Sequence, residues 1–312
     1  IHNSADPAAA EVDVYLNGAL LLDDFAFRTA TPFVDVQAGT DLSVAIAPGN
    51  STSVADAIAT FPFNLATDGK YIVVANGIVS TNGYSPNPGF DLFAYAPARE
   101  SATSGANNTD ILVFHGCTDA PAVDVNETAL LGGATLVNAI EYGEFSSYLE
   151  PPTNDYVLQV TDGTTPLVSY QAPLATLNLE GDAITVLASG FLNPAVNSNG
   201  PGFGLWVALA AGGNLVELPV FTGMAEQGLF AGSSLWPNPA TNEVNVFVPA
   251  LGDAQVEVEL LDAAGRVVRS FGAVARGNDR VIIGTSDLSA GRYSIRLSAT
   301  GSRIILPLSV VR

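Results

Sequence analysis

The 312-residue sequence predicts an all-β protein of three consecutive Ig-like antiparallel β-sandwich domains. Apolar and polar residues alternate with a period of two along many short segments. Stretches rich in Gly and Pro separate these segments, and helical periodicity is scarce. Many short strands at regular spacing are typical of β-sandwiches.

A duplication accounts for the first two predicted domains. The segment from His2 to Val12-Asp13-Val14 resembles the segment from His115 to Val123-Asp124-Val125. Each begins with a His and ends in Val-Asp-Val. Three pairs of matching positions share one separation along the chain, which we call the repeat spacing: His2 and His115, Gly77 and Gly190, Pro88 and Pro201. Chance does not keep one spacing over such a length, so we predict two related sandwiches over residues 1–98 and 110–220.

Within each copy, strand patterns dominate. The alternation of residues 42–46 in the first copy is matched by that of residues 156–160 in the second. The best helical candidate, residues 128–142, contains Gly132 and Gly133, and each Gly costs a helix about 1 kcal/mol. We therefore expect strands throughout both copies.

The last part of the chain, residues 235–312, forms a third predicted module. Alternating segments lie at 244–248, 256–260 and 293–297, and Gly265 ends a short loop suited to a hairpin. The predicted linkers before the second and third modules are residues 97–109 and 221–234. This module is expected to be a small sandwich of its own.

The charge distribution argues against two classes of partner. The formal net charge is −20, and before residue 235 only three residues are basic: Arg28, Lys70 and Arg99. An acidic body without clustered Lys or Arg is unsuited to nucleic acid or to an anionic membrane. The acidic surface favours solubility over the binding of divalent cations, because no loop has the spacing of a calcium loop.

Cysteine usage and hydropathy set further limits. The lone Cys117 cannot form an intramolecular disulfide, so the fold must rest on its apolar core. No apolar stretch is long enough for a membrane span. The chain opens at Ile1 without a leader pattern, and we expect that an exported form has already lost its leader.

The third module carries the motifs of a known export signal. Its elements are Leu235-Trp236-Pro237-Asn238-Pro239-Ala240, the segment from Val258 through Gly265 to Val268, the segment from Asp287 through Gly291 to Tyr293, and a terminus that ends in Arg312. In this order they resemble the C-terminal sorting domain of the type IX secretion system of Bacteroidota. The resemblance implies recognition by an outer-membrane translocon and an extracellular or outer-surface location. It also implies that the module is commonly cleaved after export.

The two repeats resemble a family of bacterial surface domains of unknown function. Copies in that family open with a strand that ends in His, then a Ser-Pro-Asp-Ala-Pro-like turn, then Val-Asp-Val. Residues 115–125 match this opening well, whereas the first copy is two residues longer before Val12. Because the function of that family is unknown, the resemblance implies no particular activity.

Few residues are candidates for a role in catalysis. His115 and Cys117 would share one face of a strand, as a nucleophile and its base could. His2 stands at the same repeat position with Ser4 in place of the Cys, which favours a structural role. Two His and one Cys do not supply the roughly four ligands of a zinc site. We therefore predict no enzyme and no cofactor.

Four recurrent carboxylates, Asp6, Asp13, Asp119 and Asp124, lie near the repeat openings. They are weak candidates for calcium ligands, and capping of turns is the favoured interpretation. Sequence alone cannot place any two acids at glycosidase separation. Aromatic residues near the Gly-rich loops are candidates for a sugar-stacking platform, with core packing favoured: Tyr84, Phe90, Phe93, Phe203 and Trp206.

One difference between the repeats bears on assembly. The second copy has a full apolar strand, residues 110–115, whereas the first has only Ile1 before His2. Trimming or unrecorded residues are the preferred explanation. The alternative is that a strand from another copy fills the open edge.

These observations predict a secreted, non-enzymatic structural protein of the cell surface. We expect a self-assembling homo-oligomer or polymer, such as a filament, sheath or layer subunit, or an adhesin stalk. The alternative is a module that binds a glycan or surface polysaccharide, and an enzyme with an unrecognised site is the third choice.

Overall fold

The computed structural model describes residues 1–131, 133–163, 165–221, 230, 233–248, 256–262, 266–275, 280–299 and 302–312. Within these residues the chain is built from strands, and the all-β prediction is confirmed. The described helices are three short 3₁₀ turns: η1 (Pro7–Ala9), η2 (Val54–Asp56) and η3 (Pro194–Val196). The weak helical candidate at 128–142 instead contains a strand, β10 (Ala134–Ile140).

The first repeat has one four-stranded sheet and one two-stranded sheet. The four-stranded order is β2-β1-β4-β5, and the pair is β6-β7. A short strand, β3, pairs instead with β15. The bounds are β1 (Glu11–Leu16), β2 (Ala19–Ala26), β3 (Thr29–Ala30), β4 (Asp41–Pro48), β5 (Ala59–Asn64), β6 (Ile72–Asn76) and β7 (Asp91–Tyr95).

The second repeat has two four-stranded sheets, in the orders β10-β9-β11-β12 and β16-β14-β13-β8. Strand β8 runs parallel to β13, and β13 runs antiparallel to β14. The further bounds are β8 (Asp110–His115), β9 (Val123–Glu127), β11 (Asp155–Thr161), β12 (Pro166–Pro173), β13 (Ala183–Ser189), β14 (Gly204–Leu209), β15 (Gly213–Asn214) and β16 (Val216–Glu217).

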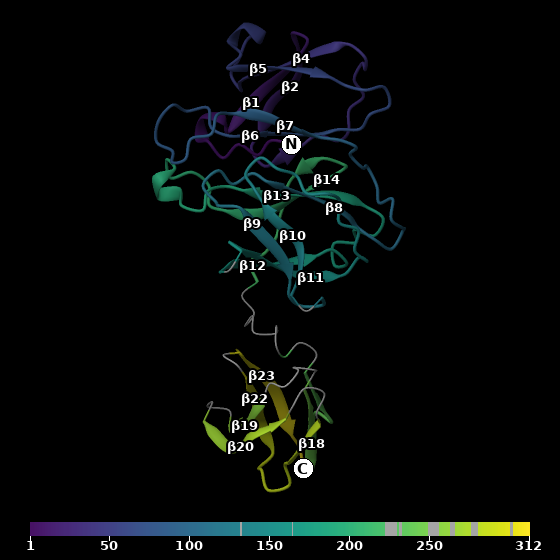
Figure 1. Ribbon diagram of the computed structural model, residues 1–312, viewed down its shortest axis with the longest axis vertical. Helices are drawn as coiled ribbons and strands as arrows, with labels where there is room; N and C mark the ends of the chain where they lie inside the picture. Colours follow the sequence, from purple (N-terminus) through teal and green to yellow (C-terminus); the bar gives the residue numbers. More distant parts are fainter. Residues whose placement is uncertain are drawn as a thin grey trace. The chain divides into compact units, whose positions relative to one another are not determined.

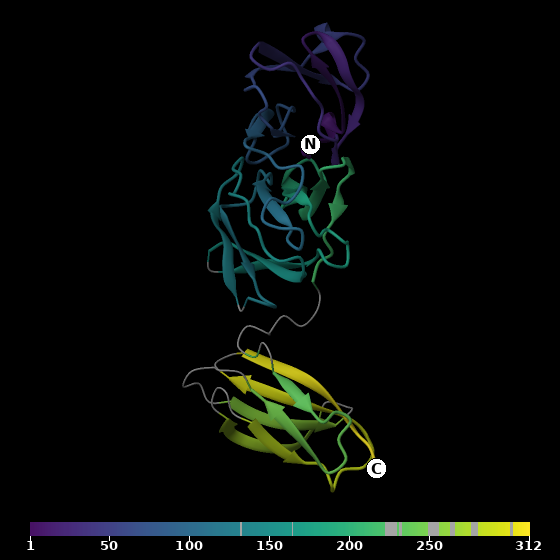
Figure 2. The same ribbon diagram turned by 90° about the vertical axis from the view of Figure 1, so that its right-hand side faces the viewer.

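The four sheets of the two repeats lie one above another (Figure 1, Figure 2). The inner layers meet through a core that contains Val74 of β6, Phe114 of β8 and Leu187 of β13. Each repeat also has a core between its own two sheets. Strand β13 faces two cores, so all its residues are buried, and all of them except Thr185 and Ser189 are apolar.

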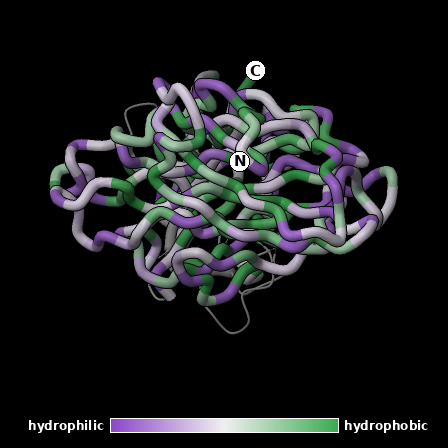
Figure 3. Tube along the Cα trace, turned by 90° about the horizontal axis from the view of Figure 1, so that it is seen from above, coloured by the Kyte–Doolittle hydropathy of each residue, from purple (hydrophilic) through white to green (hydrophobic). Residues whose placement is uncertain are grey.

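The chain forms two compact units. The first comprises residues 1–126 and 135–220, and the second comprises residues 127–134 and 221–312. Both repeats therefore lie in one unit, and the predicted division into separate domains at 1–98 and 110–220 stays a prediction. Hydrophobic segments lie largely in the middle of the view in Figure 3, with hydrophilic segments concentrated in the loops.

The C-terminal module has its own two sheets and its own core. The sheet orders are β17-β18-β21 and β20-β19-β22-β23. The core includes Val244, Val258 and Ile295, each with no exposed surface. The bounds are β17 (Ser234–Trp236), β18 (Glu243–Phe247), β19 (Val256–Asp262), β20 (Val267–Ala275), β21 (Arg280–Gly284), β22 (Gly291–Ala299) and β23 (Ser302–Val310).

Candidate functional site

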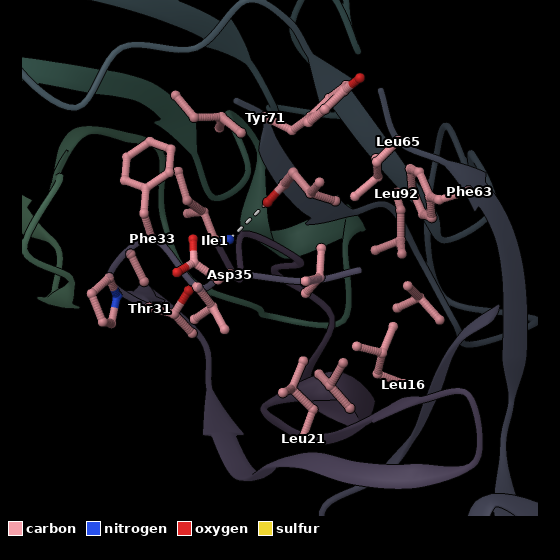
Figure 4. Close-up of a pocket in the computed structure, with 18 of the residues that line it drawn as sticks. Ile1, Leu16, Leu21, Thr31, Phe33, Asp35, Phe63, Leu65, Tyr71 and Leu92 are labelled. Carbon is pink, nitrogen blue, oxygen red and sulfur yellow. Dashed lines mark hydrogen bonds between the residues drawn. The ribbon is translucent and has the colours of Figure 1, made fainter. Parts of the chain in front are cut away.

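A cavity of about 580 Å³ opens between the four-stranded sheet of the first repeat, β6, and the inner sheet of the second repeat, which contributes Ala183, Thr185, Ala208 and Leu209. Figure 4 shows Ile1 within this cavity, with Phe33 on one side and Tyr71 on the other. The apolar lining includes Val14, Leu42, Val44, Phe63, Ile72 and Leu92. The charged residues of the lining are Asp35, Asp68 and Arg99. Such a large apolar hollow is a candidate binding site.

Ile1 and His2 close one end of the cavity by pairing with β6. The Ile1 amino group donates to the Val73 carbonyl at 2.8 Å, and the Ala75 N–H donates to the Ile1 carbonyl at 2.9 Å. His2 pairs with Ala75 in the parallel direction and with Thr29 in the antiparallel direction. Burial lowers the pKa of the Ile1 amino group to about 5.

The second repeat has a complete strand at the equivalent place. Strand β8 pairs with β13 over its whole length, from Asp110 to His115. On its other side, Ile111 and Leu149 exchange two backbone hydrogen bonds of 2.8 Å, and the Ser146 N–H donates to the Val113 carbonyl at 2.8 Å. Strand β8 therefore lies between β13 and residues 145–149.

Backbone hydrogen bonds of the first repeat have counterparts in the second repeat between residues one repeat spacing further along, in agreement with the sequence. The Asn3 N–H donates to the Ala75 carbonyl at 2.8 Å, as the Gly116 N–H donates to the Ala188 carbonyl at 3.1 Å. Ile1 and His2 therefore correspond to the last two residues of β8. The cavity lies where the second repeat has Asp110–Val113.

We call this place in the first repeat the slot. Ile72 and Val73 of β6 lie on one side of it, and residues 31–34 lie on the other. By the neighbouring backbone bonds, residues 31–34 correspond to residues 146–149 of the second repeat. Ile72 and Val73 are only half-buried, although the equivalent residues of β13 are buried. The walls of the slot are thus mostly apolar.

Two of the predicted calcium candidates cap loops. The Asp6 carboxylate accepts the backbone N–H groups of Val79 and Ser80 at 3.0 and 2.8 Å. It also accepts the Tyr84 hydroxyl at 2.7 Å, and the pKa of Asp6 is lowered by these bonds against the opposing effect of burial. Asp119 accepts the two N–H groups that lie one repeat spacing further on, at 2.7 and 2.8 Å. These contacts are those expected of capping residues.

The other two candidates each bind the backbone of a neighbouring strand. Asp13 accepts the Asp24 N–H at 3.0 Å and the Ser51 hydroxyl, and Asp124 accepts the Ala139 N–H at 2.6 Å. Asp24 and Ala139 both have positive φ, of 50° and 47°. Each carboxylate therefore satisfies a donor at an irregular point of the adjacent strand. Asp13, Asp23 and Asp24 have oxygens within 4.8 Å of one another, and the four predicted residues do not come together.

The possible nucleophile pair has structural partners. His115 Nε2 lies 3.0 Å from the Pro121 carbonyl oxygen, and the Cys117 thiol donates to Asp119 at 3.2 Å. Burial raises the pKa of the Cys117 thiol to about 12, where a nucleophilic Cys needs a lowered value. His2 Nε2 makes the equivalent contact with the Ala9 carbonyl oxygen, at 2.7 Å.

The aromatic candidates for a sugar-binding platform contact other side chains of the first compact unit. Tyr84 packs on Phe191 with ring centroids 5.7 Å apart, and Phe93 packs on Phe114 at 5.5 Å. The Arg28 guanidinium lies 3.9 Å from the Trp206 ring centroid. The two remaining rings, Phe90 and Phe203, pack against the cores of the first and second repeat respectively. These contacts are those of core and layer packing.

Several sorting-motif residues lie together on the terminal strand pair. Asn238 Nδ2 donates to the Pro307 carbonyl at 2.8 Å, and Asn238 Oδ1 accepts the Ser309 N–H at 2.9 Å. The Asn238 motif also contains Pro237 and Pro239, each after a cis peptide bond.

The later motif residues lie on or beside the same pair. Gly291 and Tyr293 of β22 pair with Val310 and Leu308 of β23. Arg312 donates to the Ser286 carbonyl at 2.8 Å. Gly265 lies outside the described residues.

Two family models cover most of the chain. A model described as "Domain of unknown function (DUF4397)" matches residues 1–126 and 109–197. The chain belongs to the DUF4397 family. A second model, "Secretion system C-terminal sorting domain", matches residues 234–308. The predicted resemblances are therefore confirmed, and the sorting domain directs this DUF4397 protein to the cell surface or the extracellular space.

Other comparisons add little. No curated protein matches the chain. One solved structure, a product complex of the multi-modular glycogen-degrading pneumococcal virulence factor SpuA, is 8% identical with a TM-score of 0.20. The alignment covers 97% of this chain and 37% of that one.

A second solved structure is SGBP-B of the Bacteroides ovatus mixed-linkage glucan utilization locus in complex with a mixed-linkage heptasaccharide. It is 11% identical with a TM-score of 0.21, and the alignment covers 96% of this chain and 60% of that one. The DUF4397 chain thus spans less than two thirds of either structure, and neither supports an assignment of function.

No motif in the sequence points to the residues that line the cavity. Among the described residues, no helix is long and apolar enough to cross a membrane.

Proposed function

We propose that the protein is a secreted, non-enzymatic structural protein of the cell surface whose copies assemble through the first repeat. The observation that carries the proposal is β2, an edge strand of the four-stranded sheet whose Leu20 and Leu21 are 51% and 43% exposed. Exposed edges of this kind add strands from other chains readily. A filament, sheath or layer subunit has use for such an edge, and an adhesin stalk can use it to join copies.

The contacts of the candidate catalytic residues support the non-enzymatic part. The Cys117 thiol has a raised pKa and a carboxylate partner, a setting that disfavours the thiolate. The carboxylates of Asp6 and Asp119 are held by backbone N–H groups of their own loops. These groups are therefore engaged in stabilising the fold.

Electron microscopy and light scattering of the purified 312-residue protein test the proposal. We expect regular filaments or particles whose mass rises with protein concentration. A monodisperse monomer at every concentration contradicts the proposal. Saturable binding to a polysaccharide by such a monomer would favour the glycan-binding alternative.

A further inference from the structure

We propose that β2 of one copy pairs in the antiparallel direction with β21 of the C-terminal module of a second copy. In this pairing Leu20 lies against Ile282, and Asp23 lies against Arg280. The inference rests on the proposed function, which places the contact between copies at β2, and it names the surface that β2 binds.

Both strands lie at the edge of a sheet. Strand β2 is at one end of the order β2-β1-β4-β5, and β21 is at one end of the order β17-β18-β21 within the described residues. On one side, each strand therefore pairs with no other strand of the described chain. Two such edges can join two sheets into one by antiparallel pairing.

An apolar residue and two acidic residues are exposed on β2. Leu20 is paired with Tyr15 of β1 and is 51% exposed. Further along β2, an irregularity of the register opposite Asp13 contains Asp23 and Asp24, which are both exposed. Oxygens of these three carboxylates lie within 4.8 Å of one another. Like charges this close repel each other, and a cation brought by a partner relieves the repulsion.

The second repeat has the same backbone arrangement with different side chains at these places. Strand β10 is the counterpart of β2, and the equivalent N–H groups of Asp24 and Ala139 fix the alignment of the two strands. By this alignment, the places of the exposed leucine and of the first aspartate are taken by Thr135 and Asn138. Both are exposed and uncharged. The shared backbone therefore does not require the apolar and acidic residues of β2.

A basic residue and an apolar residue are exposed on β21. Ile282 is 56% exposed and Arg280 is also exposed, whereas Val281 and Ile283 pack in the core of the module. The Arg280 Nε donates to the side-chain oxygen of Asn245 at 2.7 Å. This partner orients the guanidinium and is neutral, so the charge of Arg280 is not used in an ion pair with Asn245 and can pair with a carboxylate of another copy.

The order of the residues selects the antiparallel direction. Along β2 the apolar residue precedes the acidic one, and along β21 the basic residue precedes the apolar one. Antiparallel pairing therefore places Leu20 against Ile282 and Asp23 against Arg280. Parallel pairing would place a charge against each aliphatic side chain. Aliphatic pairs and pairs of opposite charge across neighbouring strands both stabilise a sheet.

The overall distribution of charge favours the same contact. Eight of the eleven basic residues follow residue 235, whereas the chain before it is strongly acidic. Complementary charge speeds association and fixes the register of a contact. Because the two surfaces differ and each copy has one of each, such a contact is head-to-tail and can continue from copy to copy. A filament is the assembly that follows from an unclosed series of these contacts.

Two variants of the full-length protein test the contact by complementation. Leu20→Asn alters β2 and leaves β21 intact, and Ile282→Asn does the reverse. In sedimentation velocity, we expect each variant alone to self-associate about tenfold more weakly than the wild type, because an amide is placed against an aliphatic side chain. An equal mixture should form one-to-one dimers and nothing larger, because one intact surface of each kind remains.

Val196→Asn is the matched control, since Val196 is 50% exposed but lies in η3 of the second repeat. It should self-associate as the wild type does. Circular dichroism melting of all three variants shows whether each is folded. A mixture of folded Leu20→Asn and Ile282→Asn proteins that stays monomeric overturns the inference.

Charge reversal tests the register. Asp23→Arg and Arg280→Asp should each weaken self-association by about tenfold, and a chain with both changes should regain most of it, because the ion pair forms again with its charges exchanged. No recovery in the double variant overturns the pairing of these two residues.

A divalent cation is the other partner that three carboxylates could take. Self-association is therefore also measured in EDTA, and we expect it to be unchanged. Oligomers that dissociate in EDTA overturn the inference, because a cation and not Arg280 then neutralises the acidic residues of β2.

The outcomes separate this inference from the proposed function. Weaker association in Leu20→Asn but not in Ile282→Asn overturns β21 as the partner and leaves assembly through β2 standing. Association that both variants retain in full overturns the two proposals together.

Discussion

The two repeats share one arrangement of loops and turns, which we call the framework, and they differ in the side chains that surround it. Asp6 and Asp119 bind the backbone of equivalent loops, and Gly77 and Gly190 approach equivalent carbonyl groups. The outer sheets differ: the edge strand β2 of the first repeat exposes Leu20 and Leu21, whereas Leu136 of its counterpart β10 packs against the core. The same arrangement of loops and turns is therefore compatible with different surfaces on the outer sheets.

The cores of the two repeats can be compared directly. In the second repeat the core between the sheets includes Tyr156, Val160, Val186 and Leu205, all at least nine-tenths buried. In the first repeat the core between the sheets includes Val12, Val14 and Ile46, which are buried to a similar extent, while Val44 beside the cavity is half-buried.

The strongest way to test the shared framework is to alter its two glycines. A Cβ on Gly77 would lie 2.4 Å from the Gly89 carbonyl oxygen, and one on Gly190 would lie 2.2 Å from that of Gly202. Both glycines have positive φ. We expect Gly77→Ala and Gly190→Ala each to lower the free energy of unfolding by about 3 kcal/mol or more, measured by urea denaturation.

Gly18 provides the control. It has φ of 84°, and nothing lies within 4 Å of its Cβ position. Gly18→Ala should cost about 1 kcal/mol. A similar cost for all three variants would show that the close approach of the backbones does not matter.

The pH dependence of stability compares the two histidines. Burial lowers the pKa of His2 from 6.5 to about 4, and that of His115 is lowered in the same direction. Between these pH values the unfolded chain binds the proton more readily, so stability rises with pH from about 4 to 6.5 and levels off above. We expect His2→Gln to reduce this rise by about 2 kcal/mol, measured as unfolding free energy against pH. An unchanged slope between pH 4 and 6.5 in His2→Gln would contradict the burial of a neutral His2.

A smaller effect separates the two cores directly. Val73 and Val186 are counterparts, but Val186 is 4% exposed and Val73 is half-buried beside the slot. We expect Val186→Ala to cost about 2 kcal/mol because it leaves a cavity, and Val73→Ala to cost about 1 kcal/mol or less. Equal costs in thermal denaturation would show that the difference in burial between the two positions does not affect stability.

Much of this architecture could be predicted from residues that act locally. The strands followed from alternation, as in residues 42–46, and the repeat followed from the spacing of His2 and His115. The capping roles of Asp6 and Asp119 were favoured because Asp accepts backbone bonds in turns.

The rest depends on contacts between distant segments. Nothing in the sequence shows that Asp6 reaches Val79, or that residues 31–34 form a wall of the slot. The packing of the inner sheets through Phe114 and Leu187 likewise depends on the three-dimensional arrangement. A buried run such as β13 does not reveal on its own which layers cover it.

Amide hydrogen exchange of β2 tests most directly whether this edge strand joins copies of the protein. At concentrations below self-association, we expect the β2 amides that are not bonded to β1 to exchange rapidly, and to become protected as the concentration rises. The amides of the inner strand β4 should not change. Self-association without any new protection in β2 would contradict assembly through this edge.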